Sequence, residues 1–342
     1  MKTKLFLLIA LISFSTASMA QNDAAKLRVN RRMAGGVRSQ INKELDQGQS
    51  PQQPQQQQSY QSQQSQTQTP APKVVATTTP KVISDVDKDI PVVKGTDEYT
   101  YAVIIGNEKY TSEAAVPYAE HDAEIFKAYV QKTLGVPEKQ IRYASNAGLN
   151  KMRASVKWLT QAMEVSEGKA KVIFYYAGHG ITNESNQSAY LLPVDGMGSD
   201  PESAYSLDKL YSELSKQPAQ YVAVFLDACF SGAKREGGML ASARGVAIKA
   251  RAQAPKGNMV VFTAAQGDET AYPYKEMGHG MFTYYLLKKL QETKGEATFG
   301  DLGTYLTKEV KHQSFLENNK MQTPAVNVAV ALQNSWKNFK LK

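Results

Sequence analysis

The chain after Tyr99 alternates between short apolar runs and segments with helical periodicity. The apolar runs predict strands buried on both faces, at residues 101–106, 171–177, 221–226 and 258–263. A short strand is expected at 141–144 and a further edge strand at 325–330. Apolar residues recur every three or four positions in segments that predict helices, at 118–134, 149–165, 207–214, 281–290 and 302–310. Because strands that alternate with helices pair in parallel through crossover connections, we expect an α/β layer sandwich with a mostly parallel central sheet.

Two of the predicted strands run directly into polar motifs. Gly178-His179-Gly180 follows the strand at 171–177, and Asp227-Ala228-Cys229 follows the strand at 221–226. In open α/β sheets, ligands bind in the crevice beyond the carboxyl ends of the strands. If these two strands are neighbours, both motifs therefore reach one crevice.

The first twenty residues have the pattern of a secretory signal peptide. Lys2 and Lys4 precede an apolar run at 5–14, and the small residues around Ala20 predict cleavage after that position. The alternative is a membrane anchor, but ten helical residues span only about 15 Å, roughly half the hydrocarbon thickness. We expect an exported protein, periplasmic or secreted, without a membrane span.

Residues 21–95 have the composition of a disordered linker. Thirteen of the twenty-two residues at 47–68 are Gln, and the following stretch to residue 93 is rich in Pro, Thr and Val. The alternative is a removable pro-segment, for which Arg31 and Arg32 are exposed dibasic candidates. We therefore place the folded domain at residues 96–342.

Composition excludes several classes of protein and site. With 42% hydrophobic and 21% charged residues, the 342-residue chain can bury a sizeable core. The net charge of +8 is spread along the chain, so we expect no nucleic-acid partner. Cys229 is the sole cysteine, which rules out an intramolecular disulfide and a cysteine-based metal centre.

Cys229 is a candidate nucleophile because one histidine has a matching position. A thiol attacks as its thiolate and needs a group that accepts its proton, which histidine does near neutral pH. Of the four histidines, only His179 lies between two glycines at the end of a predicted buried strand. The backbone N–H groups of Gly180 and Cys229 are candidates for an oxyanion hole. The alternatives are a buried apolar cysteine and a structural histidine.

These motifs resemble those of a known peptidase family. The strings FYYAGHG (174–180), LPVD (192–195) and FLDACFSG (225–232) resemble the caspase and metacaspase superfamily of cysteine peptidases. The strings VIIGNEKY (103–110) and GHGMFT (278–283), with Asp122-Ala123, resemble its bacterial members. The fifty residues between His179 and Cys229 match the separation known for caspases.

The resemblance implies a fold and roles for individual residues. The fold would be a caspase-like three-layer sandwich. His179 would be the general base, Cys229 the nucleophile, and the Gly180 and Cys229 N–H groups the oxyanion hole. Caspases that cut after Asp have Gln before Ala-Cys and Arg after it, whereas this chain has Asp227 and Phe230 at those positions. That difference argues against cleavage after Asp.

Two carboxylates match the substrate-binding positions of metacaspases. Asp122 and Asp227 correspond to the S1 residues that pair with Arg or Lys at P1. A guanidinium binds a carboxylate pair by bidentate hydrogen bonds and relieves the cost of burying it. We therefore expect a basic P1 residue. The alternatives are that Asp227 binds loop N–H groups and that Asp122 only stabilises a helix start. His121 and His279 are interpreted as surface or packing residues.

The segment at about 230–257 resembles the processing loop that separates the two portions of the family fold. It carries several Lys and Arg residues and no Asp, which leads to the hypothesis that the enzyme cuts itself there. Some metacaspases also bind calcium, but no EF-hand-like loop is visible and no cofactor is required for the dyad chemistry. The acidic candidates for calcium are Asp195, Asp200, Glu202 and Glu236.

The sequence thus predicts an exported cysteine endopeptidase that cuts protein or peptide substrates after Arg or Lys, with self-processing as a corollary. One alternative is a catalytically silent caspase-like binding or signalling module. Another is a hydrolase or transferase that uses the same His179–Cys229 dyad on a small acyl substrate. The sequence makes no prediction about oligomeric state.

Overall fold

The structure is a computed structural model that describes residues 82–230, 250 and 254–342. The predicted signal peptide, most of the predicted linker and most of the predicted processing loop lie outside the described residues.

A six-stranded sheet forms the centre of the domain, in the order β11-β8-β7-β3-β1-β2. Its strands are β1 (Thr100–Gly106), β2 (Ile141–Ser145), β3 (Lys171–Ala177), β7 (Tyr221–Asp227), β8 (Met259–Thr263) and β11 (Ala325–Val328). All neighbouring pairs are parallel except β11 with β8, which is antiparallel. The expected mostly parallel sheet with a closing edge strand is confirmed.

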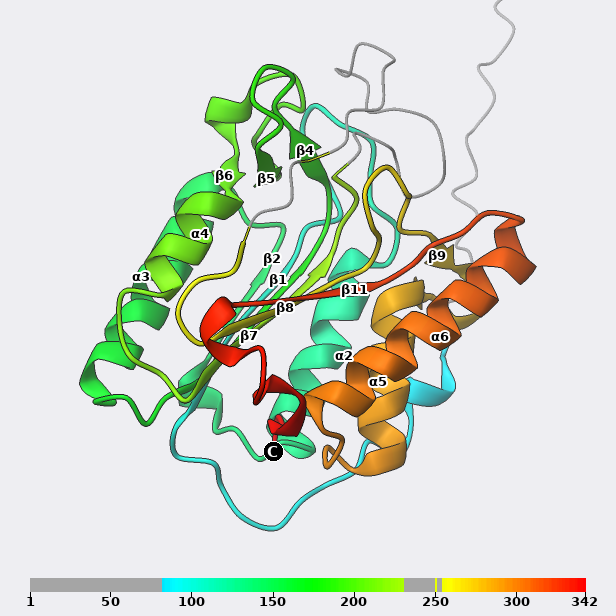
Figure 1. The fold of residues 1–342 in the computed structure, drawn as a ribbon. Coiled ribbons are helices and arrows are strands. Elements are labelled where there is room, and N and C mark those ends of the chain that lie inside the picture. The colour runs from blue at the N-terminus through cyan, green and yellow to red at the C-terminus, as the bar shows by residue number, and fades with distance from the viewer. Residues whose placement is uncertain (1–81, 231–249, 251–253) are drawn as a thin grey trace, which may run out of the picture. The chain divides into compact units, whose positions relative to one another are not determined.

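Helices cover both faces of this sheet (Figure 1). On one face lie α2 (Ala119–Lys132), α5 (Met281–Thr293) and α6 (Phe299–Asn318), and on the other lie α3 (Leu149–Val165) and α4 (Leu207–Leu214). Side chains of β1 show why two helical layers are needed. Ala102 and Ile104 are buried in one cluster, while Val103 and Ile105 are buried in the other. The three-layer sandwich is therefore confirmed.

Short elements complete the domain. Two small antiparallel sheets contain β4 (Gly180–Thr182), β5 (Ala189–Leu191) and β6 (Tyr205–Ser206), and β9 (Pro273–Tyr274) and β10 (His279–Gly280). The short 3-10 helices are η1 (Asp85–Asp87), η2 (Glu138–Gln140), η3 (Pro201–Ser203), η4 (Lys275–Met277), η5 (Val330–Leu332) and η6 (Trp336–Asn338).

Helix α6 is longer than the sequence predicts. Its start is set by Thr298, whose hydroxyl accepts a hydrogen bond from the Asp301 N–H at 3.1 Å, as an N-cap residue does. Its last two turns, from residue 311 on, are mostly exposed and carry few buried side chains. Apolar periodicity is therefore weak there, which is why the prediction ends at residue 310.

The segment at 84–93, here called the N-terminal strap, packs on the domain instead of belonging to a linker. Val86 is completely buried, and its carbonyl accepts a hydrogen bond from the Tyr129 hydroxyl at 2.9 Å. The Thr133 hydroxyl donates to the Pro91 carbonyl at 2.7 Å. Here the structure differs from the prediction, because a single buried valine in a polar segment leaves no periodic pattern.

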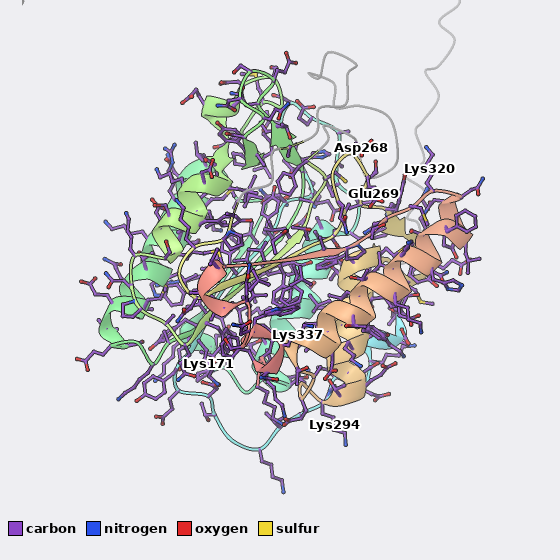
Figure 2. All side chains as sticks on the ribbon, viewed as in Figure 1. Lys171, Asp268, Glu269, Lys294, Lys320 and Lys337 are labelled. Carbon is purple, nitrogen blue, oxygen red and sulfur yellow. The ribbon has the colours of Figure 1, made fainter. Side chains whose placement is uncertain are left out.

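The two ends of the sheet carry different side chains. Lys171 opens β3 at the amino end, whereas Asp268 and Glu269 follow β8 at the carboxyl end (Figure 2). The two polar motifs at 178–180 and 227–229 also lie at the carboxyl end, because they come after β3 and β7. Across the described residues, we find no helix with the length and apolarity needed to cross a membrane.

Candidate active site

Neighbouring strands bring the two polar motifs together. Strands β3 and β7 pair in parallel with Ala177 opposite Asp227, and the Gly178 N–H donates to the Asp227 carbonyl at 3.2 Å. His179 and Cys229 therefore each lie two residues beyond one matched pair. A methyl group added at Gly180 would lie only 2.7 Å from the Cys229 carbonyl oxygen, so the backbones of both motifs are in contact. The condition set by the sequence, that the two strands be neighbours, is met.

Hydrogen bonds hold the His179 backbone and ring in place. The His179 N–H donates to the Tyr110 hydroxyl at 2.8 Å, and the two rings lie 4.7 Å apart. The Tyr176 hydroxyl donates to the His179 carbonyl at 2.8 Å, and burial raises the pKa of Tyr176 well above its ordinary value, so that proton stays. Both tyrosines thus hold the His179 backbone, and the Tyr110 ring also contacts the imidazole; Tyr110 is a residue that sequence reasoning did not single out.

The ring of His179 has a defined tautomer. Its Nε2 lies 2.8 Å from the Ala114 carbonyl oxygen. A carbonyl oxygen only accepts hydrogen bonds, so the neutral ring carries its proton on Nε2 and keeps its lone pair on Nδ1. His179 is therefore arranged to accept a proton at Nδ1.

The Cys229 sulfur is buried and accepts a backbone hydrogen bond. Its residue is 6% exposed, and the Ala271 N–H lies 2.8 Å from Sγ. A donor at this distance stabilises a thiolate, whereas the Ala271 carbonyl, 3.6 Å from Sγ, accepts a hydrogen bond from the thiol. The donating segment is itself fixed by the fully buried Gln322, whose side-chain oxygen accepts from the Tyr272 N–H at 2.7 Å. Gln322 lies far along the chain from Cys229, so no local pattern pointed to it.

Asp227, one of the two predicted S1 residues, is completely buried. Its Oδ2 accepts hydrogen bonds from the Thr283 hydroxyl at 2.7 Å and from the Thr283 N–H at 3.3 Å. The Tyr175 hydroxyl lies 2.7 Å from that same Thr283 hydroxyl. Asp227 thus binds the first turn of α5 while its backbone leads directly to the nucleophile.

Asp122, the other predicted S1 residue, is completely buried against His279. Its Oδ1 lies 2.8 Å from His279 Nδ1, and the Gly280 N–H donates to both carboxylate oxygens at 3.1 and 3.0 Å. His279 is also completely buried, with its Nε2 3.0 Å from Asp87 Oδ1. The interpretation of His279 as a surface or packing residue is wrong, because its ring joins two carboxylates.

Electrostatics follow from this arrangement. Burial alone would lower the pKa of His279, but hydrogen bonds and charges of Asp122 and Asp87 raise it to about 9. Burial alone would raise the pKa of Asp87, but hydrogen bonds from His121 and His279 hold it below its ordinary value. His279 is therefore a cation at neutral pH.

The two predicted S1 carboxylates share one anchor. Asp122 binds His279 and Gly280, and Asp227 binds Thr283, so both attach to the five residues 279–283 where α5 begins. The structure brings them to the same segment, next to the motif that carries Cys229. Their S1 role stays a prediction.

Two of the candidate calcium residues, Asp195 and Asp200, accept hydrogen bonds from backbone N–H groups. Asp195 Oδ1 accepts from the Leu149 N–H at 2.9 Å at the start of α3, and Asp200 Oδ1 accepts from the Glu202 N–H at 3.1 Å. Glu236 lies outside the described residues. Calcium dependence stays a prediction without support from these contacts.

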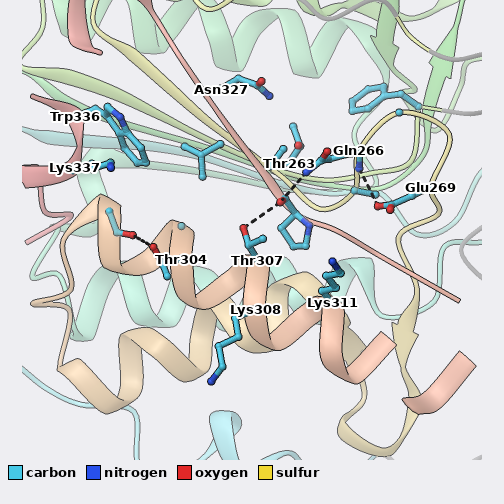
Figure 3. A pocket seen from close by; sticks show the side chains of 18 of the residues that line it. Thr263, Gln266, Glu269, Thr304, Thr307, Lys308, Lys311, Asn327, Trp336 and Lys337 are labelled. Atoms are coloured by element: carbon cyan, nitrogen blue, oxygen red, sulfur yellow. Dashed lines mark hydrogen bonds between the residues drawn. The ribbon is translucent and has the colours of Figure 1, made fainter. Parts of the chain in front are cut away.

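A hollow of about 1380 Å³ lies beside β8, β11 and α6. Figure 3 shows part of its lining, where Gln266 and Thr307 both donate to the Pro324 carbonyl, at 3.5 and 3.2 Å. Phe230 also lines the hollow, but His179 and Cys229 do not. The hollow therefore borders the candidate site without containing its dyad.

Comparisons with known proteins bear on the fold and the family of the chain. A protein from Geobacter sulfurreducens has a similar structure, with a TM-score of 0.53 and 16% identity over 70% of this chain and 97% of that chain. Caspase-1 from Spodoptera frugiperda has a TM-score of 0.46 and 17% identity over 71% of this chain and 92% of its own. Among curated proteins, none matches the chain. A family model described as the caspase domain matches residues 100–332, and the chain accordingly belongs to the caspase-domain family of peptidases.

Proposed function

We propose that the protein is a cysteine endopeptidase that cuts after Arg or Lys. The observation that carries the proposal is the register of β3 and β7, which places His179 and Cys229 two residues beyond the matched pair Ala177 and Asp227. Membership of the caspase-domain family supports cysteine-peptidase chemistry. The choice of P1 residue rests on Asp227 and Asp122.

The dyad performs acyl transfer in two stages. His179 Nδ1 takes the proton of Cys229, and the sulfur attacks the carbonyl carbon of the scissile bond. The N–H groups of Gly180 and Cys229 stabilise the resulting oxyanion, after which the leaving amine takes the proton from His179. Water, deprotonated by the same imidazole, then hydrolyses the thioester and restores the thiol.

Asp227 is assigned the larger part in P1 selection. Asp227 ends the strand that leads to the proposed nucleophile and lies two residues before Cys229, closer to it in sequence than Asp122 is. The charge of Asp122 is already balanced by the cationic His279. A P1 guanidinium therefore gains more from Asp227. Asp122 then acts mainly by holding the segment that binds Asp227.

A set of matched fluorogenic peptides with Arg, Lys or Asp at P1 tests the proposal on the full chain. We expect turnover of the Arg and Lys peptides alone, and loss of all turnover in Cys229→Ala. Asp227→Asn should reduce kcat/KM for the Arg peptide about 100-fold, and Asp122→Asn should reduce it less. Cleavage of the Asp peptide alone would contradict the P1 assignment. No turnover of any peptide would favour the silent binding module.

Self-processing and export belong to the same proposal. The Lys and Arg residues of the predicted processing loop would be substrates for a protease with basic P1 preference. Intact-mass measurements of the wild type and Cys229→Ala should show fragments only for the wild type. Fractionation of cells that express the full chain should find a product that starts at Gln21 outside the cytoplasm. A product outside the cytoplasm that retains residues 1–20 would count against the signal peptide.

A further inference from the structure

A second group of reactive side chains lies away from the dyad. Asp87 of the N-terminal strap lies between two histidines, with His279 Nε2 3.0 Å from its Oδ1 and His121 Nε2 3.1 Å from its Oδ2. One ligand atom from each of the three residues lies within 4.8 Å of the others. The strap contacts α2 through Tyr129 and α5 through Lys288. Helix α2 carries His121, and His279 lies just before α5 (Figure 1). Three segments distant in sequence thus converge.

The surroundings of His279 match those of metal-binding histidines. A histidine that binds a metal through one nitrogen usually donates its other ring N–H to a carboxylate, which fixes the ring orientation. Here His279 Nδ1 lies 2.8 Å from the completely buried Asp122, which leaves Nε2 facing Asp87. The His121 and His279 rings are stacked with centroids 4.8 Å apart, so their Nε2 atoms reach the same carboxylate. Asp122 is not one of the three ligand candidates; it is a second carboxylate that would orient His279 from outside the metal site.

We propose that Asp87, His121 and His279 form a zinc site that fixes the N-terminal strap to the peptidase domain. Two imidazole nitrogens and a carboxylate oxygen are a common zinc donor set, and water completes the tetrahedron. Calcium takes six to eight oxygen ligands, which this group does not offer. With metal–ligand bonds of about 2.0–2.1 Å, tetrahedral ligand atoms lie about 3.3 Å apart. The two histidines now face different oxygens of Asp87 and the ligand atoms lie within 4.8 Å of one another, so zinc would draw them together by small side-chain movements.

Access and exchange are compatible with metal uptake. The His121 side chain is 16% exposed and that of Asp87 is 7% exposed, so the site has a solvent-facing side, whereas that of His279 is closed to solvent. Zinc would replace the Nε2 proton of the cationic His279, which leaves to solvent while Nδ1 keeps its proton toward Asp122, and a neutral His121 would bind through Nε2 with its proton on Nδ1. Bound zinc would therefore convert two hydrogen bonds into coordinate bonds without moving the strap to a new place.

The test is a zinc titration of untagged, chelator-treated full-length protein that carries Cys229→Ala, because a cysteine thiolate could bind zinc separately from the proposed site. Competition with a chromophoric chelator gives the affinity, and elemental analysis after dialysis gives the stoichiometry. In this background, His121→Gln is the diagnostic variant: its amide can still donate a hydrogen bond to Asp87 but binds zinc poorly. His312→Ala, on the exposed side of α6, is the matched control.

We expect one zinc ion per chain in the parent and in His312→Ala, and about 100-fold weaker binding in His121→Gln. Zinc should raise the melting temperature of the parent, because it binds the folded state, and should leave that of His121→Gln nearly unchanged. Asp87→Asn should weaken binding as well, which checks the third ligand. Substoichiometric uptake by the parent, or equal affinity in His121→Gln, would overturn the proposal and leave a hydrogen-bonded triad.

Discussion

The tripeptide Gly-His-Gly occurs twice in this chain, and the two copies have opposite environments. His179 follows β3, and its Nε2 faces the uncharged Ala114 carbonyl. His279 precedes α5, and both ring nitrogens face carboxylates, Asp122 and Asp87. The first ring, when neutral, thus keeps a lone pair on Nδ1, whereas the second is held as a cation with a pKa of about 9. The difference shows that the partners of a histidine, rather than its flanking residues, decide its chemistry.

Removal of each histidine ring in turn should have its largest effect on peptide turnover. His179→Ala removes the proton acceptor of the dyad, so we expect kcat/KM on a basic peptide to fall by at least about 1000-fold. The far-ultraviolet circular dichroism spectrum should remain that of the wild type. If His279→Gln loses as much activity while staying folded, the two histidines would not have separate roles.

For the free energy of unfolding, the larger effect is expected from the His279 variant and not from the His179 variant. His279→Gln leaves two buried carboxylates, Asp122 and Asp87, without their cation, so we expect the free energy of unfolding to fall by about 3–5 kcal/mol. Urea denaturation of chelator-treated protein measures the change. His312→Ala, which alters an exposed histidine, should shift the midpoint very little. A loss below about 1 kcal/mol in His279→Gln would mean that the ion pairs do not stabilise the fold.

The contribution of His279 to the free energy of unfolding should also depend on pH. His279 has a pKa of about 9 in the folded protein and an ordinary value of 6.5, so its folded state binds the proton more tightly. This contribution, about 3 kcal/mol, is complete below pH 6.5 and is lost as the pH rises through 9. In chelator-treated protein, the wild type should lose stability over that interval relative to His279→Gln. Parallel curves for the two proteins would contradict the assignment.

Glycine substitutions give smaller and separable effects. At Gly180, an added methyl group would lie 2.6 Å from Phe230 Cδ1 and 2.7 Å from the Cys229 carbonyl, so Gly180→Ala should lower kcat/KM about 10-fold or more. Gly278 has a φ of +65° and would place that methyl 3.3 Å from Val82 Cβ. Gly278→Ala should therefore cost about 1 kcal/mol of stability and little activity. Urea denaturation and peptide turnover on both variants check this division.

The fold was predictable because its signals are local. Four strands of the parallel sheet, β1, β3, β7 and β8, are each built on a continuous apolar run, and the polar motifs at 178–180 and 227–229 follow two of them. Strand β2, at the edge, has an exposed Arg142 and a weaker pattern. The family resemblance is confirmed by the match over residues 100–332. The catalytic roles of His179 and Cys229 stay predictions, now with a geometry that allows them.

Contacts between distant segments were not predictable. Asp122 and His279 are 157 residues apart, and only the packing of α2 against the start of α5 makes them partners. The same holds for Tyr110, which binds the His179 backbone from 69 residues away. A short polar segment such as the N-terminal strap has no periodicity that separates it from a linker.

The buried Val86 shows that the folded domain begins earlier in the chain than the match to the family model. The match to the family model begins at residue 100, but the folded domain also includes the N-terminal strap. Val86 of the strap is completely buried against the domain, and Lys288 of α5 binds Asp85 of the strap at 2.7 Å. An expression clone that begins at residue 100 would expose the apolar core surface that Val86 covers, and His279 would lose its contact with the Asp87 carboxylate. Clones for crystallisation or enzymology should therefore begin before Ser84.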